Sequence, residues 1–115
     1  MRVAEFYEKT GGNYADTMGR LMTEERILRF VKKFPADGSF ALLKDALARG
    51  CREEAFRAAH TLKGVAQNLG FTSLYEKASA VTEILRGGSM EVAHLMPELE
   101  KLYLLTIESI NELED

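Results

Sequence analysis

His60, Lys63 and Gly64 place an imidazole, an ammonium group and a position without a side chain within about one helical turn. Residues three and four apart on a helix are neighbours on its surface, so Lys63 and Gly64 both lie beside His60. A neutral histidine is a nucleophile near neutral pH. The lysine supplies positive charge, and the glycine leaves room beside the imidazole. These residue types predict a site at which a histidine takes and holds a phosphoryl group.

The helix predicted around this stretch has one apolar side, and His60 does not lie on it. On a helical wheel of roughly 100° per residue, small and apolar residues gather on one broad side: Ala55, Ala58, Ala59, Leu62, Val65, Ala66 and Leu69. His60 falls close to Gly64 and Gln67, away from the centre of that side. The sequence therefore predicts an accessible histidine on a helix whose opposite face is buried.

Each residue of this group also has an ordinary interpretation. A single histidine on a helix is usually a surface or boundary residue, and a single lysine is usually just solvated. A glycine inside a helix costs roughly 1 kcal/mol relative to alanine, so Gly64 marks either the close approach of another molecule or a weak point. The surrounding residues must decide between these interpretations.

The stretch from Phe56 to Gly70 reads FRAAHTLKGVAQNLG and resembles the signature of histidine-containing phosphotransfer (HPt) domains of bacterial phosphorelays. The similarity includes the apolar lead-in, the alanine before the histidine, the HxLKG core and the final glycine. It extends more loosely to about residues 20–110. The resemblance implies a four-helix bundle without autokinase activity, which relays phosphoryl groups in two-component signalling.

The resemblance also implies a role for each residue of the core. His60 would accept a phosphoryl group from an aspartyl phosphate on one receiver domain and pass it to another. Lys63 would help to neutralise the phosphoryl oxygens through charge-assisted contacts, and Gly64 would keep the approach to the imidazole open. The implied partners are receiver domains of response regulators and hybrid histidine kinases. Magnesium is expected on the receiver, and no cofactor is expected on this chain.

The chain departs from the family pattern on the following helix, where many members place a glutamine that hydrogen-bonds the second imidazole nitrogen. If the chain turns back near Phe71, Thr82 lies roughly opposite His60, and its shorter side chain weakens control of the imidazole tautomer. Gln67, two turns along the same face, could substitute or could simply be solvated. Arg86 lies where related proteins can carry a basic residue near the phosphoryl group, although a cation is also favourable at this helix C-terminus.

Aromatic residues near the predicted site are candidates for a partner surface, because aromatic side chains commonly anchor interfaces. Phe56 and Phe71 are preferred for their expected nearness to His60 or to the adjoining turn, although packing in the core explains them equally well. Thr82 keeps an alternative function open. In that alternative the chain is a phosphotransfer-inactive helical adaptor that binds receiver domains.

Length and composition fit a single globular domain. The 115 residues, 46% of them hydrophobic and with a net charge of −3, suffice for one substantial core and give no reason to expect a nucleic-acid partner. The single cysteine, Cys51, cannot form an internal disulfide. The sequence contains neither a signal peptide nor an apolar stretch of roughly 20 residues. We expect a free-standing, cytoplasmic monomer with one HPt-like domain over residues 1–115 and a bundle core at about 20–113.

Other chemistry finds little support in the sequence. Glu91 and His94 have the i, i+3 spacing used by di-metal bundles, but such bundles repeat this motif and add two further glutamates. The other histidine, His60, has no acid three residues before it. Neither a Ser-His-Asp arrangement nor a glycine-rich phosphate loop is recognisable. We therefore predict no metal site and no ATP hydrolysis.

Helix signals cover most of the chain and predict an all-α fold. Short N-terminal helices are expected over residues 3–9 and 14–21. Thr23 is followed by acids and is expected to cap a helix that runs to Phe34. Ser39 is expected to cap the next helix.

The helix that carries the predicted site is expected over about residues 52–69, with Gly70 in the C′ position. Ser73 and Glu76 form a capping-box pattern for the following helix, which the glycines at 87–88 close.

The last helical segment is expected to start near Ser89 and to be restarted or kinked by Pro97. Short connections between successive helices favour antiparallel neighbours. The sequence therefore predicts an up-down-up-down four-helix bundle with one or more additional short N-terminal helices.

Overall fold

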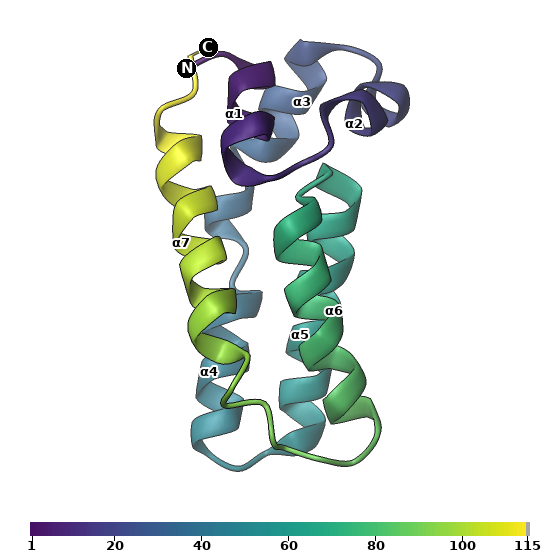
Figure 1. Cartoon of the computed structure of the whole chain (residues 1–115), viewed down its shortest axis with the longest axis vertical. Helices are drawn as coiled ribbons and strands as arrows, with labels where there is room; N and C mark the ends of the chain where they lie inside the picture. Colours follow the sequence, from purple (N-terminus) through teal and green to yellow (C-terminus); the bar gives the residue numbers. More distant parts are fainter. Residues whose placement is uncertain (115) are drawn as a thin grey trace.

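The computed structural model describes residues 1–114, and within that range all regular elements are helices. Four of them lie side by side and form the body of the molecule (Figure 1), namely α4 (Ser39–Ala48), α5 (Arg52–Leu69), α6 (Thr72–Arg86) and α7 (Met96–Asn111). In this view the chain descends in α4, ascends in α5, descends in α6 and ascends in α7. The predicted all-α fold is confirmed.

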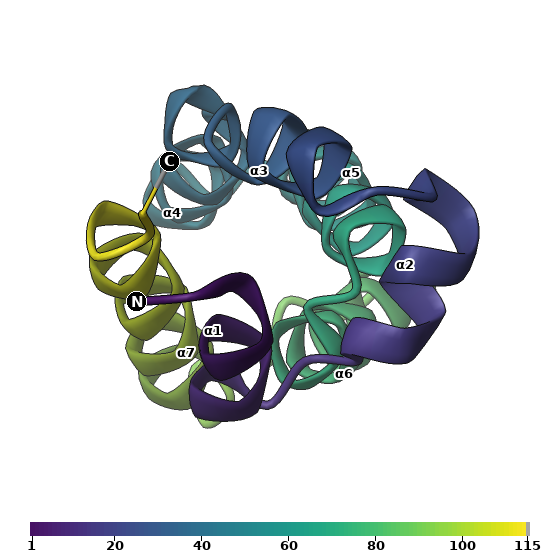
Figure 2. The same ribbon diagram turned by 90° about the horizontal axis from the view of Figure 1, so that it is seen from above.

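The four helices surround a common core, as the view from above shows (Figure 2). Each helix contributes a leucine with no exposed surface: Leu43, Leu62, Leu85 and Leu99. The first and last helices of the bundle are joined directly, because Phe40 stacks on Tyr103 with ring centroids 4.4 Å apart. A salt bridge of 2.9 Å between Lys44 and Glu100 lies on the outside of the same pair of helices.

Three short N-terminal helices lie across one end of the bundle (Figure 1): α1 (Val3–Thr10), α2 (Tyr14–Leu21) and α3 (Glu24–Val31). They are held there by an aromatic cluster in which Phe71 contacts Phe6 of α1 and Phe34, with ring centroids 5.7 and 5.2 Å apart. In α2, the Arg20 guanidinium donates hydrogen bonds to the carbonyls of Gln67 and Asn68 at 2.9 and 2.8 Å. The carbonyl of Gln67 also accepts a hydrogen bond from the capping N–H of Gly70 at 3.2 Å, whereas Arg20 supplies a partner for the carbonyl of Asn68 at the end of α5.

Helix α5 has the bounds that the sequence predicts. Glu53 and Glu54 lie in its first turn, where negative charge is favourable. It ends at Gly70, whose φ of 73° is in the left-handed region that glycine adopts without strain. Local signals at both ends thus fix the length of the helix that carries His60.

Two predicted helix caps are wrong. Ser39 is already the first residue of α4, because the carboxylate of Asp37 accepts a hydrogen bond from its backbone N–H at 2.9 Å. The hydroxyl of Ser73 does not cap α6 but donates to the carbonyl of Gly11 at 3.1 Å, and α6 begins at Thr72. At the start of α4, the neighbouring Asp37 provides the hydrogen-bond acceptor that was expected from Ser39. At the start of α6, a distant backbone carbonyl binds the Ser73 hydroxyl that was expected to cap the helix.

The helix that Thr23 caps is shorter than predicted. It ends at Val31, and a separate 3-10 turn (Phe34–Ala36) follows, because Pro35 cannot continue the α-helical hydrogen bonding. The segment after α6 is not helical at residues 89–95, and α7 begins at Met96 with Pro97 in its first turn. None of the described helices is both long and apolar enough to span a membrane.

Candidate functional site

His60 lies on the exposed side of α5, as the wheel predicts. The opposite side of this helix packs into the core through residues with no exposed surface: Ala55, Ala59, Leu62 and Ala66. Burial of these small residues fixes the rotation of α5 about its axis. The imidazole is therefore presented to solvent by a rigid element of the fold.

Gly64 leaves open space one turn beyond His60. A methyl group built at this position would meet no atom of the surrounding protein within 4 Å. Packing inside the chain therefore does not require glycine here, although glycine weakens the helix. The free space lies on the outside of α5, where a docking partner can use it.

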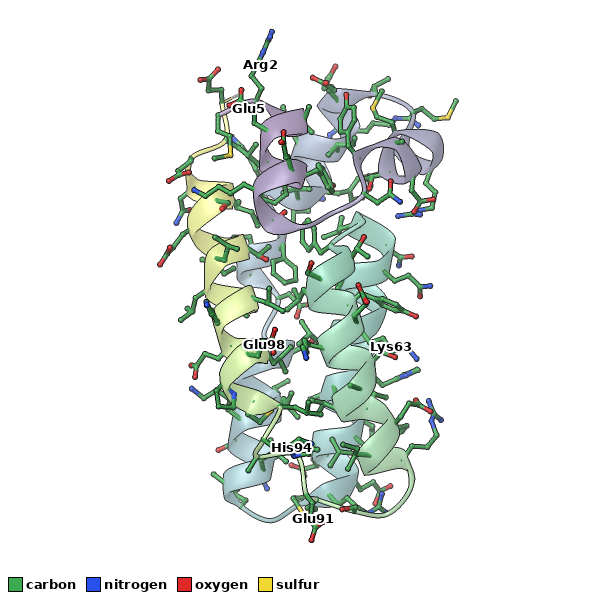
Figure 3. The ribbon with its side chains drawn as sticks, in the orientation of Figure 1. Arg2, Glu5, Lys63, Glu91, His94 and Glu98 are labelled. Atoms are coloured by element: carbon green, nitrogen blue, oxygen red, sulfur yellow. The ribbon has the colours of Figure 1, made fainter. Side chains whose placement is uncertain are left out.

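Lys63 is the one cation beside His60 that no carboxylate neutralises in the described part of the chain. Its side chain is half-buried and projects outward from α5 (Figure 3). By contrast, Arg57 forms a salt bridge of 3.1 Å with Glu53 on the same helix. The ammonium group of Lys63 thus forms no salt bridge within residues 1–114.

The ring of Phe56 contacts both the imidazole of His60 and a cation of the neighbouring helix, Arg86. Its ring lies nearly parallel to the imidazole of His60, with ring centroids 5.8 Å apart and an angle of 14° between the planes. The guanidinium carbon of Arg86, at the end of α6, lies 5.0 Å from the centroid of the same Phe56 ring. Arg86 also donates a hydrogen bond of 3.2 Å to Glu83. Arg86 is therefore held near the site by Phe56 and is already paired with an acid.

Thr82 does not provide the contact that its position suggests. Its side chain is fully buried, and its hydroxyl donates a hydrogen bond of 2.7 Å to the carbonyl of Ala78 in its own helix. Within residues 1–114 the imidazole of His60 has no hydrogen-bond partner. Thr82 is thus not a supporting residue of the imidazole, and the weakening predicted from its short side chain is complete, because the backbone four residues earlier satisfies its hydroxyl.

Gln67 lies on the exposed side of α5, two turns beyond His60. Its backbone carbonyl accepts a hydrogen bond from Arg20, so α2 contacts α5 at this end of the surface that carries His60. A hollow of about 210 Å³ lies beside it, lined in part by Asp16 and Tyr75. Gln67 therefore borders the surface around His60 and makes no hydrogen bond to the imidazole.

The prediction that Phe71 contacts a partner is wrong. Its side chain is 1% exposed, because the N-terminal helices cover it. The rings of Phe6, Tyr7 and Phe34 all lie against it, at centroid distances of 5.7, 6.2 and 5.2 Å. Phe71 is thus a core residue that joins α1 to the bundle, whereas Phe56 stays at the surface.

The described residues offer no metal centre. No group of three or more histidine, cysteine or acidic side chains within residues 1–114 is placed to hold a metal ion. Glu91 and His94 lie in the non-helical segment between α6 and α7 (Figure 3), so their spacing does not put them on one face of a helix. The chemistry that the site offers is that of a nucleophilic imidazole beside a free ammonium group.

The site lies on an outward-facing helix surface, which suits docking of a protein domain. A hollow of about 680 Å³ lies elsewhere, between the end of α4 and the start of α7. It is lined mainly by apolar side chains, among them Leu47, Met90 and Met96, and by none of the residues around His60. The imidazole of His60 therefore lies on open helix surface, outside this hollow.

The stacking of Phe56 on His60 is a feature of the site that the sequence did not predict. Phe56 is expected there only as a partner contact. Its spacing of four residues from the histidine was the available signal, since residues at i and i+4 meet on a helix surface. The contribution of Arg86 through this ring depends on the packing of α6 against α5, which the local sequence does not encode.

Comparison with known families agrees with this geometry. The model of the family described as Hpt domain matches residues 36–114. The chain belongs to the Hpt domain family. The matched segment contains α4 to α7 and His60, whereas α1 to α3 precede it. No curated protein and no solved structure is significantly similar to the chain.

Membership of this family defines the general role of the protein. Hpt domains are phosphotransfer modules of two-component signalling rather than classical enzymes, and they interact with receiver domains in phosphorelays. The chain therefore has a phosphotransfer-related role in two-component signalling.

Proposed function

We propose that this protein relays a phosphoryl group between aspartates of receiver domains through His60. The observation that carries the proposal is the exposed imidazole on α5, with the open space of Gly64 one turn further on, inside the segment that matches the Hpt family. The protein acts in this role as a cytoplasmic monomer, without kinase activity of its own.

In the first step a neutral imidazole nitrogen of His60 attacks the phosphorus of an aspartyl phosphate on the donor receiver. The N–P bond forms while the bond from phosphorus to the aspartate oxygen breaks, and the carboxylate leaves with the electron pair. In the second step a carboxylate oxygen of the next receiver attacks the phosphorus. The N–P bond then breaks, and its electron pair returns to the imidazole nitrogen.

Lys63 contributes by placing positive charge beside the phosphoryl oxygens during both steps. Charge-assisted hydrogen bonds of this kind are stronger than neutral ones, and Lys63 has no competing salt bridge in the described part of the chain. Gly64 contributes by letting the receiver approach the backbone of α5. The proposal assigns magnesium to the acidic pocket of the receiver and no cofactor to this chain.

Transfer of label from a receiver tests the proposal. A panel of purified receiver domains is phosphorylated with a labelled phosphoryl group and mixed with the protein. We expect label on the protein that is labile in acid and stable in base, as phosphohistidine is. His60→Gln abolishes it, whereas His94→Gln, which removes the other histidine, leaves it unchanged. Labelling that persists in His60→Gln would refute the assignment.

One observation favours a second function, that of an inactive adaptor. The imidazole lacks a hydrogen-bond partner within residues 1–114, and Thr82 is turned to its own helix. A protein that had lost phosphotransfer would keep the bundle and still bind receivers. Binding of receivers by the folded protein without transfer of label from any of them would support the adaptor.

A further inference from the structure

Within residues 1–114, Phe56 is the only aromatic ring that contacts the imidazole of His60. The torsion that turns a histidine ring about its Cβ–Cγ bond is broad and roughly two-fold. A hydrogen bond to a ring nitrogen usually narrows it, but His60 has no such partner in this part of the chain. The parallel ring of Phe56, at a centroid distance of 5.8 Å and an angle of 14°, is the contact that restricts it.

Phe56 is itself held in place from both helices. It is half-buried on α5, and the guanidinium of Arg86 packs over its ring from α6 at 5.0 Å. A cation over an aromatic ring is attracted by the negative face of that ring. The salt bridge of 3.2 Å to Glu83 in turn limits the freedom of Arg86. The imidazole thus packs on Phe56, and Phe56 packs on Arg86 of α6. These contacts link His60 to α6 although its imidazole makes no hydrogen bond within residues 1–114.

We infer that Phe56 is a positioning residue for His60, which holds the imidazole plane by stacking and leaves the nitrogen-bearing edge of the ring open to the incoming phosphorus. This inference rests on the proposed function. Its physical basis is that in-line attack on phosphorus requires a nucleophile with a defined direction, and a poorly directed nucleophile loses rate even when it stays accessible. The aromatic ring supplies the direction that Thr82 does not supply.

Substitutions of Phe56 separate stacking from simple filling of space. Phe56→Leu keeps an apolar side chain but removes the flat ring, Phe56→Met does the same with a flexible side chain, and Phe56→Tyr keeps the ring. Phe30→Leu is the matched control, because Phe30 is an exposed phenylalanine in α3 that also lies beside a cation, with the Lys33 nitrogen 5.7 Å from its ring centroid. Melting temperatures verify that each variant is folded.

Phosphoramidate is the phosphoryl donor, because this small molecule phosphorylates histidine without docking and so reports on the imidazole alone. We expect Phe56→Leu and Phe56→Met to slow phosphorylation of His60 by about tenfold. Phe56→Tyr and Phe30→Leu are expected to react as fast as the unmodified chain. Equal rates for Phe56→Leu and the unmodified chain, or a Phe56→Tyr rate as low as that of Phe56→Leu, would overturn the inference.

Nuclear magnetic resonance of ¹⁵N-labelled histidine gives a readout that loss of bulk alone would not change. The chain has 2 histidines, so His94 serves as the internal reference. The ring protons of His60 lose their ring-current shift in Phe56→Leu and keep it in Phe56→Tyr, whereas those of His94 do not move. If the ring-current shift at His60 is absent in the unmodified chain, the inference is overturned whatever the rates. If the unmodified chain accepts no phosphate from phosphoramidate or from receivers, the proposed function fails first.

Discussion

Tyr7 and Leu69 lie 62 residues apart in the chain and are joined by a hydrogen bond of 2.6 Å, which the phenol hydroxyl donates to the backbone carbonyl. This bond ties α1 to the end of α5, the helix that carries His60. Tyr7 is 1% exposed, and burial raises its pKa to about 12. The N-terminal helices, which precede the family match, are therefore bonded into the structure that supports the site.

Removal of the Tyr7 hydroxyl is expected to destabilise the whole fold. Tyr7→Phe lowers the free energy of unfolding by about 1 kcal/mol, because the buried carbonyl of Leu69 loses its short hydrogen bond. Urea denaturation at pH 7 measures the change. Tyr75→Phe is the control, since Tyr75 is a half-buried tyrosine of α6. A loss in Tyr7→Phe no greater than in this control would contradict the prediction.

Tyr7 also makes stability depend on pH in the alkaline range. A tyrosine in the unfolded chain ionises near pH 10, whereas the pKa of folded Tyr7 is about 12. The unfolded state therefore releases its proton first, so the contribution of Tyr7 is complete below pH 10 and is lost as the pH rises toward 12. Two pKa units correspond to about 2–3 kcal/mol.

Denaturation curves between pH 9 and pH 11.5 test this dependence. Tyr7→Phe is expected to flatten the fall in unfolding free energy over that range. A smaller slope should remain, because the pKa of Tyr14 is raised by its hydrogen bond to Glu24 and the pKa of Tyr103 is raised by burial. Equal slopes in Tyr7→Phe and the unmodified chain would show that Tyr7 does not titrate as its burial requires.

Gly64→Ala is expected to stabilise the fold while it impairs function. A methyl group at this position meets nothing within 4 Å, so the variant gains about 0.5–1 kcal/mol of helix propensity. The same methyl group obstructs the docking of a receiver and slows transfer by about tenfold. Gly19→Ala is the matched control, because Gly19 is also helical and equally free of neighbours. If Gly64→Ala transfers the phosphoryl group as fast as Gly19→Ala does, Gly64 is not part of the docking surface.

Lys63→Ala is expected to slow phosphotransfer with little change in stability. Loss of one charge-assisted contact to the phosphoryl oxygens lowers the rate by about tenfold. The melting temperature should stay nearly constant, because the side chain forms no salt bridge within residues 1–114. Lys101→Ala, which removes an exposed lysine of α7, is the control. Transfer rates that match this control with several receivers would exclude Lys63 from the mechanism.

Local signals in the sequence predict the helix of the site well. The bounds of α5 follow from acids in its first turn and from Gly70 at its end, and the exposure of His60 follows from the small apolar residues on the opposite side. Such signals act within a few residues of one another. The fold class and the exposure of His60 could therefore be predicted without knowledge of the tertiary structure.

Apart from two helix bounds, the errors concern side chains whose partners are decided by distant or competing groups. Ser73 bonds to Gly11 in the N-terminal helices instead of capping α6. Phe71 is covered by those same helices, so it is buried where an exposed aromatic residue was expected. Thr82 lies on the expected helix, yet its hydroxyl finds a carbonyl of its own backbone. Such choices depend on packing, which a single sequence does not specify.

A two-receiver relay tests the central proposal most directly. The protein is first phosphorylated by a labelled receiver and freed from it, and is then mixed with a second, unlabelled receiver. We predict that label leaves His60 and appears on the aspartate of the second receiver. When His60→Gln replaces the protein, label should stay on the donor receiver and appear neither on the variant nor on the second receiver. Label that reaches the second receiver equally well through His60→Gln, or phosphorylated His60 that no receiver discharges, would contradict the proposal.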